Sequence, residues 1–291
     1  MLEIYRSSVK IDYLRAIETE FRNDIFELRD SAGAFHDIKV ARSNVDGTVY
    51  RLLDDSMLNL QNLKIADAAI LDNAFYALGG RLTLTQIQIL NTTVDYAVMN
   101  VRRCKDFYLR YVYVDKSTVK DYIFSLTKVK ANLEDIGIQR STFSTVTRVT
   151  RSNVTFINLY WRTNIATGGA KLLIAESSAL SIVNFHSVFD KSSEAQSEVM
   201  KLVETELKSN NITFVMKNID SLTVIPVFKW KYTRNRRSLQ QNINVECPNK
   251  FNARMTQESV DHNLEVVCKT CPRETYSLEA GQLKKINPIY R

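Results

Sequence analysis

Few residues of this 291-residue chain have the types and spacing that catalysis requires. Glu134 and Asp135 are adjacent carboxylates, and Arg110 precedes them by about one period of an internal repeat described below. Clustered carboxylates bind calcium, and paired carboxylates serve glycoside hydrolysis. Asp135 is also expected at a bend, and Asp54 and Asp55 are expected to begin a turn. The sequence therefore predicts no catalytic residues and no enzyme.

Cofactor chemistry has no support in the sequence either. His36 and His186 fall at outward positions of distant repeats, so they cannot form one site. The chain contains no glycine-rich phosphate loop, no HExxH and no Gly-x-Ser-x-Gly. We predict no cofactor and no metal.

A binding face is the better candidate for function. Tyr111, Tyr113 and Tyr160 are expected outside the fold on nearby repeats, with Gly137 between Tyr113 and Tyr160. Such aromatic side chains can stack on sugars or anchor a protein partner, so carbohydrate and cell-surface protein are the candidate ligands. The alternative is that surface tyrosines simply favour strands.

The charge balance gives a weaker signal. The formal net charge is +7 and the pI is about 9.1, but the charges look dispersed, with one main basic cluster at 229–237. We interpret that cluster as a solvated loop and expect no nucleic-acid partner, because no recognition motif accompanies it.

The apolar runs are shorter than the ~20 residues of a membrane span. No signal-peptide core follows Met1, so either the protein is cytosolic or Met1 is not its natural start.

An apolar pattern recurs about every 24 residues. Its second apolar position occupies Ile11, Phe35, Leu60, Leu84, Leu109, Leu133, Phe156 and Ile182. Its third occupies Leu14, Ile38, Leu63, Ile87, Val112, Ile136, Leu159 and Phe185. Self-similarity at this period indicates a solenoid, in which stacked coils bury a core that no single coil could bury.

A two-residue offset between the second and third apolar positions identifies the kind of solenoid. The second residue of the offset is Tyr13, Asp37, Asn62, Gln86, Tyr111, Asp135, Asn158 and Asn184. Asn and Asp tolerate the left-handed backbone that a sharp bend needs. We therefore predict a parallel β-helix of eight or more coils. The crossover rule makes it right-handed.

A leucine-rich repeat is the rival fold, because "LEDIGIQRSTF" at 133–143 fits its pattern. A leucine-rich-repeat fold would imply an intracellular interaction protein. In this chain, an extra apolar residue lies two residues before the second apolar position of the repeat, whereas a leucine-rich repeat would place it three residues before. This spacing favours the β-helix.

Two features lie near the chain ends. Residues 190–210 have helix-forming composition, with Val199, Leu202, Val203 and Leu207 at helical spacing, so a helical insertion is expected near 190–210.

The first coil begins within ten residues of Met1 without a cap. Solenoids usually cap their open sheet edges, so the sequence favours a fragment that lacks upstream coils.

The C-terminal stretch is rich in cysteine. The segment "CKTCPRETYSLEAG" contains Cys268 and Cys271 and resembles the ephrin-receptor-like, cysteine-rich extracellular module. A pectin-lyase-like β-helix followed by such a module resembles uncharacterised surface proteins of ciliates, which usually carry membrane spans beyond it. The resemblance implies an extracellular or cell-surface location. This chain departs from that layout because it ends at Arg291 without later cysteine pairs or a span.

The resemblance also implies roles for the cysteines. Cys247 and Cys268 could close a disulfide loop, and Cys271 would pair with a residue beyond Arg291. The alternative is a zinc site of Cys247, His262, Cys268 and Cys271, although the first spacing is poor for a zinc finger. Cys104 is expected as a buried free thiol.

Three sequons, at Asn91, Asn153 and Asn211, permit glycosylation if the protein is secreted. They do not indicate secretion, since chance predicts about that many.

We expect a β-helix over 1–245 and a truncated cysteine-rich module over 246–291. The predicted function is a non-catalytic structural, adhesive or binding segment of a larger extracellular or cell-surface protein. Membrane attachment would come only through segments absent from this sequence. The alternative function is a polysaccharide-active enzyme or a degenerate relative of one.

Overall fold

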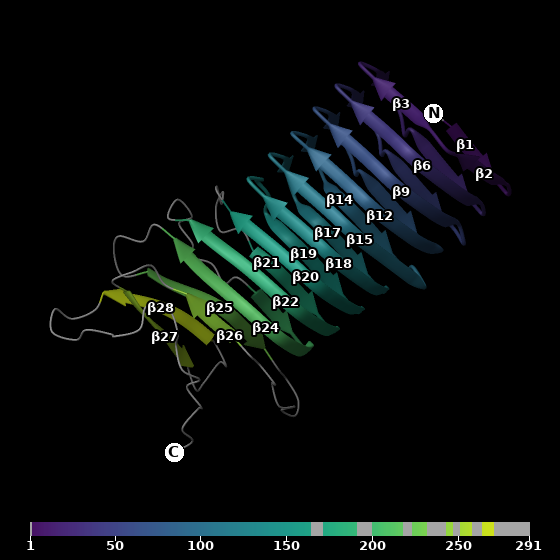
Figure 1. The fold of residues 1–291 in the computed structure, drawn as a ribbon. Coiled ribbons are helices and arrows are strands. Elements are labelled where there is room, and N and C mark those ends of the chain that lie inside the picture. Colours follow the sequence, from purple (N-terminus) through teal and green to yellow (C-terminus); the bar gives the residue numbers. More distant parts are fainter. Residues whose placement is uncertain are drawn as a thin grey trace.

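The computed structural model describes residues 2–163, 171–190, 200–217, 223–231, 243–246, 251–257 and 264–270. These residues form an all-β parallel solenoid of about eight turns with about 24 residues per coil (Figure 1). The predicted β-helix is thus confirmed. The leucine-rich repeat is not confirmed, because successive coils stack their strands in two long parallel sheets, and the early coils add a third.

Each coil contributes one strand to the face sheet, the sheet that begins with β1. Along this sheet the strands are β1 (Leu2–Tyr5), β5 (Phe26–Arg29), β8 (Tyr50–Leu53), β11 (Phe75–Leu78), β14 (Ala97–Arg102), β17 (Tyr122–Thr127), β19 (Thr145–Thr150), β21 (Lys171–Glu176), β23 (Met200–Val203), β25 (Thr223–Lys231), β28 (Leu264–Thr270) and β27 (Phe251–Gln257). Pairing is parallel up to β25, and β28 and β27 then pair antiparallel.

The bent sheet holds the repeat pattern found in the sequence. Its strands are β2 (Ser8–Ile11) with β3 (Leu14–Ile17), β6 (Ala32–Ala41), β9 (Met57–Ala66), β12 (Arg81–Leu90), β15 (Asp106–Asp115), β18 (Lys130–Gln139), β20 (Asn153–Thr163), β22 (Ala179–Asp190), β24 (Glu206–Lys217) and β26 (Ile243–Glu246). A narrow sheet closes the early coils with β4 (Glu20–Phe21), β7 (Asn44–Val45), β10 (Ala69–Ile70), β13 (Thr93–Val94) and β16 (Thr118–Val119).

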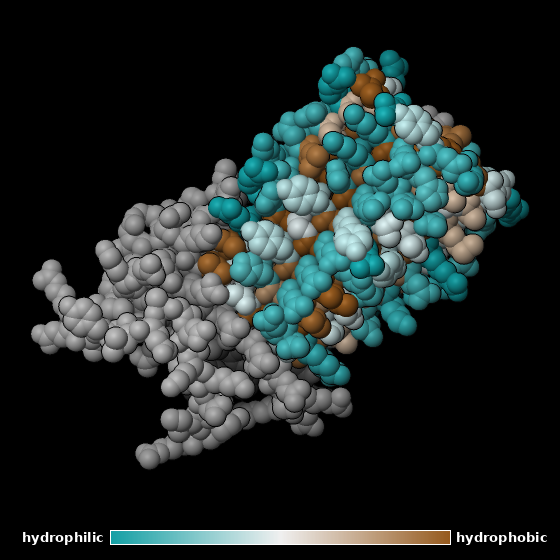
Figure 2. Space-filling view, viewed as in Figure 1, coloured by the Kyte–Doolittle hydropathy of each residue, from teal (hydrophilic) through white to brown (hydrophobic). Residues whose placement is uncertain are grey.

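The register confirms the predicted apolar columns. Leu60 pairs with Phe35 and Leu84, and Leu63 pairs with Ile38 and Ile87. All of these side chains are at most 1% exposed. Side chains alternate between core and solvent along a strand, so both halves of each bent strand bury their apolar residues. Figure 2 shows the outer surface, where hydrophobic residues emerge at several places between hydrophilic ones.

The predicted bend is also confirmed. Asn62 has φ of 60°, and Asp37, Gln86, Tyr111, Asp135, Asn158 and Asn184 have φ between 53° and 58°. Tyr13 is the exception, since its φ is not in this region. Several bend side chains form a ladder: Asn158 Nδ2 donates to Asp135 Oδ1 at 2.7 Å, and Asn184 Nδ2 donates to Asn158 Oδ1 at 3.0 Å.

The prediction of a helical insertion near 190–210 is wrong for the residues of this range that the structure describes. Residues 200–203 form strand β23, and Glu206 begins β24. Glu204 makes the turn between them with φ of 48°. Leu202 and Leu207 are buried in the core of one more coil. Residues 191–199 lie outside the described part of the chain.

Columns of Ser and Thr hydroxyls tie the coils together at two corners, a feature the sequence analysis missed. Ser31 Oγ donates to the Arg29 carbonyl at 2.7 Å, and the Ser31 N–H donates to Ser56 Oγ at 3.2 Å. The first column contains Ser7, Ser31, Ser56, Ser152, Ser178 and Thr205, and the second contains Thr19, Ser43, Thr92, Ser117 and Ser141. The hydroxyl oxygens accept hydrogen bonds from buried backbone N–H groups of the preceding coil, such as that of Ser31, which would otherwise lack a partner.

Candidate functional site

The predicted tyrosines lie on the outer face of the bent sheet. Tyr113, Gly137, Tyr160 and His186 occupy one column on β15, β18, β20 and β22. Tyr113 and Tyr160 are each 37% exposed. The Tyr160 and His186 rings stack, with centroids 5.5 Å apart and planes 6° apart. We call these four residues the aromatic column. Its spacing along the solenoid is about 4.8 Å per coil.

Gly137 allows the ring of Tyr113 to lie across it. A Cβ atom at Gly137 would come within 3.2 Å of Tyr113 Cδ2, and the Gln139 amide donates a hydrogen bond to the Tyr113 hydroxyl. The ring therefore lies close over Gly137, and its hydroxyl end is held by Gln139. The role of His186 was missed in the sequence, although its register with Tyr160 follows from the repeat.

Tyr111 is placed apart from the aromatic column. It is the bend residue of β15, with φ of 57° and 48% exposure. The guanidinium of Arg110 lies 4.5 Å from the centroid of its ring. The structure thus brings Tyr113 and Tyr160 together and leaves Tyr111 at the neighbouring corner.

The predicted set of Arg110, Glu134 and Asp135 does come together, but its members form ion pairs with one another. Arg110 Nε lies 3.4 Å from both Glu134 Oε2 and Asp135 Oδ2. Tyr108 contacts Glu134 at 3.2 Å, and desolvation together with this carboxylate raises the pKa of Tyr108. The hydrogen bond to Asp135 raises the pKa of the Arg110 guanidinium. Both carboxylates serve local ion pairs.

The remaining acidic and histidine candidates are separate. Asp54 lies in a turn with φ of 61°, as predicted, and Asp55 pairs with Lys105 at 3.1 Å. His36 lies on β6, far along the solenoid from His186 on β22. Within the described ranges, no group of three or more His, Cys, Asp or Glu residues could hold a metal ion.

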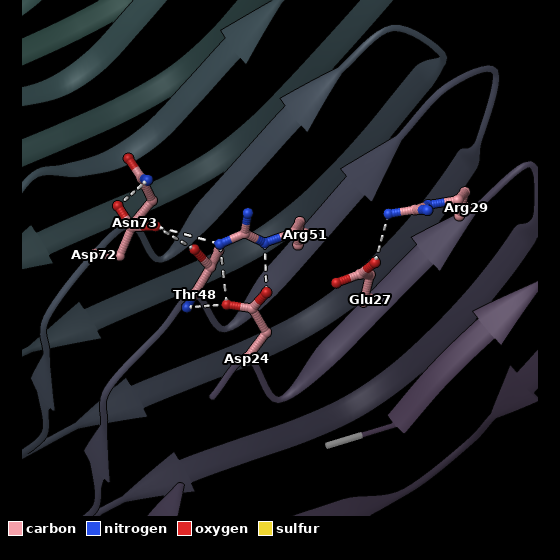
Figure 3. Close-up of polar contacts among 7 residues, drawn as sticks. All are labelled: Asp24, Glu27, Arg29, Thr48, Arg51, Asp72 and Asn73. Atoms are coloured by element: carbon pink, nitrogen blue, oxygen red, sulfur yellow. Dashed lines mark hydrogen bonds and ion pairs between the residues drawn. The ribbon is translucent and has the colours of Figure 1, made fainter. Parts of the chain in front are cut away.

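A polar cluster around Asp24 was not predicted from the sequence (Figure 3). Arg51 on β8 forms an ion pair with Asp24, whose side chain is 9% exposed, and lies 3.5 Å from Asp72. The Thr48 N–H donates to Asp24 Oδ1 at 2.6 Å, and the Thr48 hydroxyl donates to Asp72 at 3.0 Å. Asn73 also donates to Asp72 at 2.6 Å. Asp24, Thr48 and Asn73 belong to turns that enter the face sheet, so this cluster fixes three coils to one another.

The sequons differ in their surroundings. Asn91 Nδ2 donates to Asp67 Oδ1 at 2.7 Å, and Asn211 Nδ2 donates to Asn184 Oδ1 at 3.0 Å. Asn153 is exposed at the first residue of β20. All three remain predictions as glycosylation sites.

Cys104 is a buried free thiol, as predicted. Its Sγ lies 2.7 Å from the Gly79 carbonyl oxygen, and burial raises the pKa of the thiol to about 12. Cys268 lies on β28, but its side chain is outside the described set. Cys247, His262 and Cys271 also lie outside it. The disulfide, zinc and domain-boundary predictions therefore stay predictions.

No protein-family model, curated protein or solved structure matches this chain. The resemblance to pectin-lyase-like β-helices and to the cysteine-rich module thus stays a proposal. Among the described residues, no helix has the length and apolar character needed to cross a membrane.

Proposed function

We propose that this chain is a non-catalytic structural, adhesive or binding segment of a larger extracellular or cell-surface protein. The observation that supports this most is the aromatic column, which presents rings on a rigid outer face. Because the supporting strands are hydrogen-bonded on both sides, ligand binding would cost little ordering of the backbone.

The engaged carboxylates favour binding over catalysis. Glycoside hydrolysis needs one carboxyl group that holds a proton and a second that attacks or activates water. Glu134 and Asp135 instead share one guanidinium. Asp115, the buried carboxylate nearest in sequence to the aromatic column, forms an ion pair with Arg140.

An extended sugar chain is the ligand class that suits the aromatic column. The faces of Tyr and His rings can stack against the apolar faces of sugar rings, and the tyrosine hydroxyls can hydrogen-bond. Together with the cysteine-rich resemblance, this supports an extracellular pectin-lyase-like scaffold that binds carbohydrate.

Removal of the aromatic column tests this proposal. We expect the Tyr113→Ala/Tyr160→Ala variant to bind its best ligands on a glycan array at least about tenfold more weakly, equal to about 1.4 kcal/mol. The matched control is Tyr5→Ala, which removes a tyrosine that is 55% exposed on β1. Equal losses in both variants, or unchanged binding in the double variant, would contradict the proposal.

A further inference from the structure

The basic excess of this chain is concentrated along part of the solenoid. Residues 1–100 contain 10 Lys and Arg and 14 Asp and Glu, a net charge of −4. Residues 101–162 contain 12 Lys and Arg and 5 Asp and Glu, a net charge of +7. The expectation of dispersed charges is therefore wrong. An acidic stretch over 1–100 thus adjoins a basic stretch over 101–162.

Three of these cations lie at one corner of the solenoid. Arg103, Lys128 and Arg151 are the left-handed bend residues between the face sheet and the bent sheet in three consecutive coils, with φ of 56°, 55° and 50°. The Arg103 N–H donates to the Thr127 carbonyl, and the Lys128 N–H donates to the Thr150 carbonyl, each at 2.9 Å. The three backbones thus repeat at about 4.8 Å. We call these three residues the basic corner.

The backbone does not require basic residues at these bends. Earlier coils make the same bend with Asp30 and Asp54, and a later coil makes it with Glu204. All three side chains of the basic corner are exposed, and none of them forms an ion pair with another described residue. Adjacent like charges repel. A run of three therefore favours an anionic ligand.

A groove lies directly beside the basic corner. It has a volume of about 270 Å³ and crosses the starts of β15, β18 and β20. Its lining residues are Asp106, Phe107, Tyr108, Lys130, Ala131, Asn132, Asn153 and Thr155. Asn132 Oδ1 is buried without a hydrogen-bond partner in the described structure. Lys130 adds a fourth cation, while Asp106 is held 3.7 Å from Arg81.

We propose that the basic corner and this groove bind a linear sulfated polysaccharide that runs along the solenoid axis. Sulfate groups would contact Arg103, Lys128 and Arg151, because guanidinium groups bind such oxyanions through paired hydrogen bonds and the lysine ammonium binds them as a compact positive charge. The sugar rings would lie against Tyr108, with hydroxyls donating to Asn132 Oδ1. This assignment rests on the proposed extracellular binding function, and it uses a surface separate from the aromatic column.

The probe is heparin, with the same polymer after desulfation and a single-stranded DNA oligonucleotide as comparisons. Affinity of the full chain is measured by calorimetry at two salt concentrations. For Arg103→Gln/Lys128→Gln/Arg151→Gln we expect Kd for heparin to rise at least about tenfold and its salt dependence to fall, because fewer counterions are released. The charge-matched control is Lys10→Gln/Arg15→Gln/Arg22→Gln, three exposed cations of the first coil, with an expected change below about twofold.

Four results would overturn the assignment. Equal losses in the two triple variants would show that net charge alone attracts heparin. Undiminished binding of the desulfated polymer would exclude sulfate recognition. Tighter binding of DNA than of heparin would indicate a nucleic-acid site. Absent heparin binding, with glycan binding through the aromatic column intact, would remove this inference and leave the proposed function standing.

Discussion

Replacing Tyr50 with alanine is expected to lower the free energy of unfolding by about 3–5 kcal/mol. The Tyr50 ring is fully buried and stacks between Phe26 and Phe75, with centroids 4.7 Å and 5.3 Å away. Phe35 packs edge-on against it at 5.5 Å. Because the rings come from successive coils, the lost side chain would leave a cavity that neighbouring coils cannot close. Denaturant titration followed by circular dichroism measures the change.

Replacing Tyr50 with phenylalanine should not lower the free energy of unfolding. The Tyr50 hydroxyl is buried without a hydrogen-bond partner in the described structure, so its removal should be neutral or stabilise by about 1 kcal/mol. Burial also raises the pKa of Tyr50 well above its usual value. The folded wild type should therefore lose stability as pH rises above about 10, and Tyr50→Phe should lose less. A clear destabilisation by Tyr50→Phe would show that the hydroxyl has a partner.

Replacing Arg51 with methionine should lower the free energy of unfolding by about 3 kcal/mol. The change leaves the Asp24 carboxylate buried with the Thr48 N–H as its remaining strong partner. The double variant Asp24→Asn/Arg51→Met should recover part of the loss, because it removes the uncompensated charge. The same denaturant titration measures both.

A matched variant separates this effect from loss of any surface ion pair. Arg42 pairs with Glu18 at 3.1 Å, and both side chains are at least 60% exposed. Arg42→Met should therefore cost less than about 1 kcal/mol. If Arg51→Met costs no more than Arg42→Met, the cluster around Asp24 does not hold the coils together.

The repeat was predictable because one backbone geometry recurs. Leu60 and Leu63 lie on either side of the bend at Asn62, as the pattern predicted. Buried and exposed side chains alternate before and after this left-handed residue. Asn and Asp mark such bends because their side chains tolerate this conformation. At the corner between the face sheet and the bent sheet, Asp30 carries that signature but Arg103 and Lys128 do not, so residue type alone does not locate this corner in every coil.

The errors have physical causes as well. Leu202 and Leu207 fit helical spacing, but the same residues are buried in two successive strands once Glu204 turns the chain between them. Stacking on the preceding coil outweighs helix propensity here, since each strand gains a partner edge. The Asp24 cluster was missed because Asp24, Thr48 and Asp72 lie in turns, where the repeat pattern sets no residue type.

The aromatic column was only partly predictable. Tyr113 and Tyr160 follow from outward positions in the repeat, but the orientation of a ring depends on its neighbours. Gly137 and Gln139 hold Tyr113 against the sheet, and His186 stacks on Tyr160. Such pairings need the register between coils, which varies from 23 to 26 residues in the sequence.

The most direct test of a non-catalytic scaffold is the length of a polysaccharide chain after incubation with the protein. Polygalacturonate and the best ligands of the glycan array are incubated with the full chain and calcium, and polymer mass is followed by light scattering. We predict that polymer mass stays constant while binding is retained. A falling mass that the Glu134→Gln/Asp135→Asn variant abolishes would contradict the proposed function and identify an enzyme.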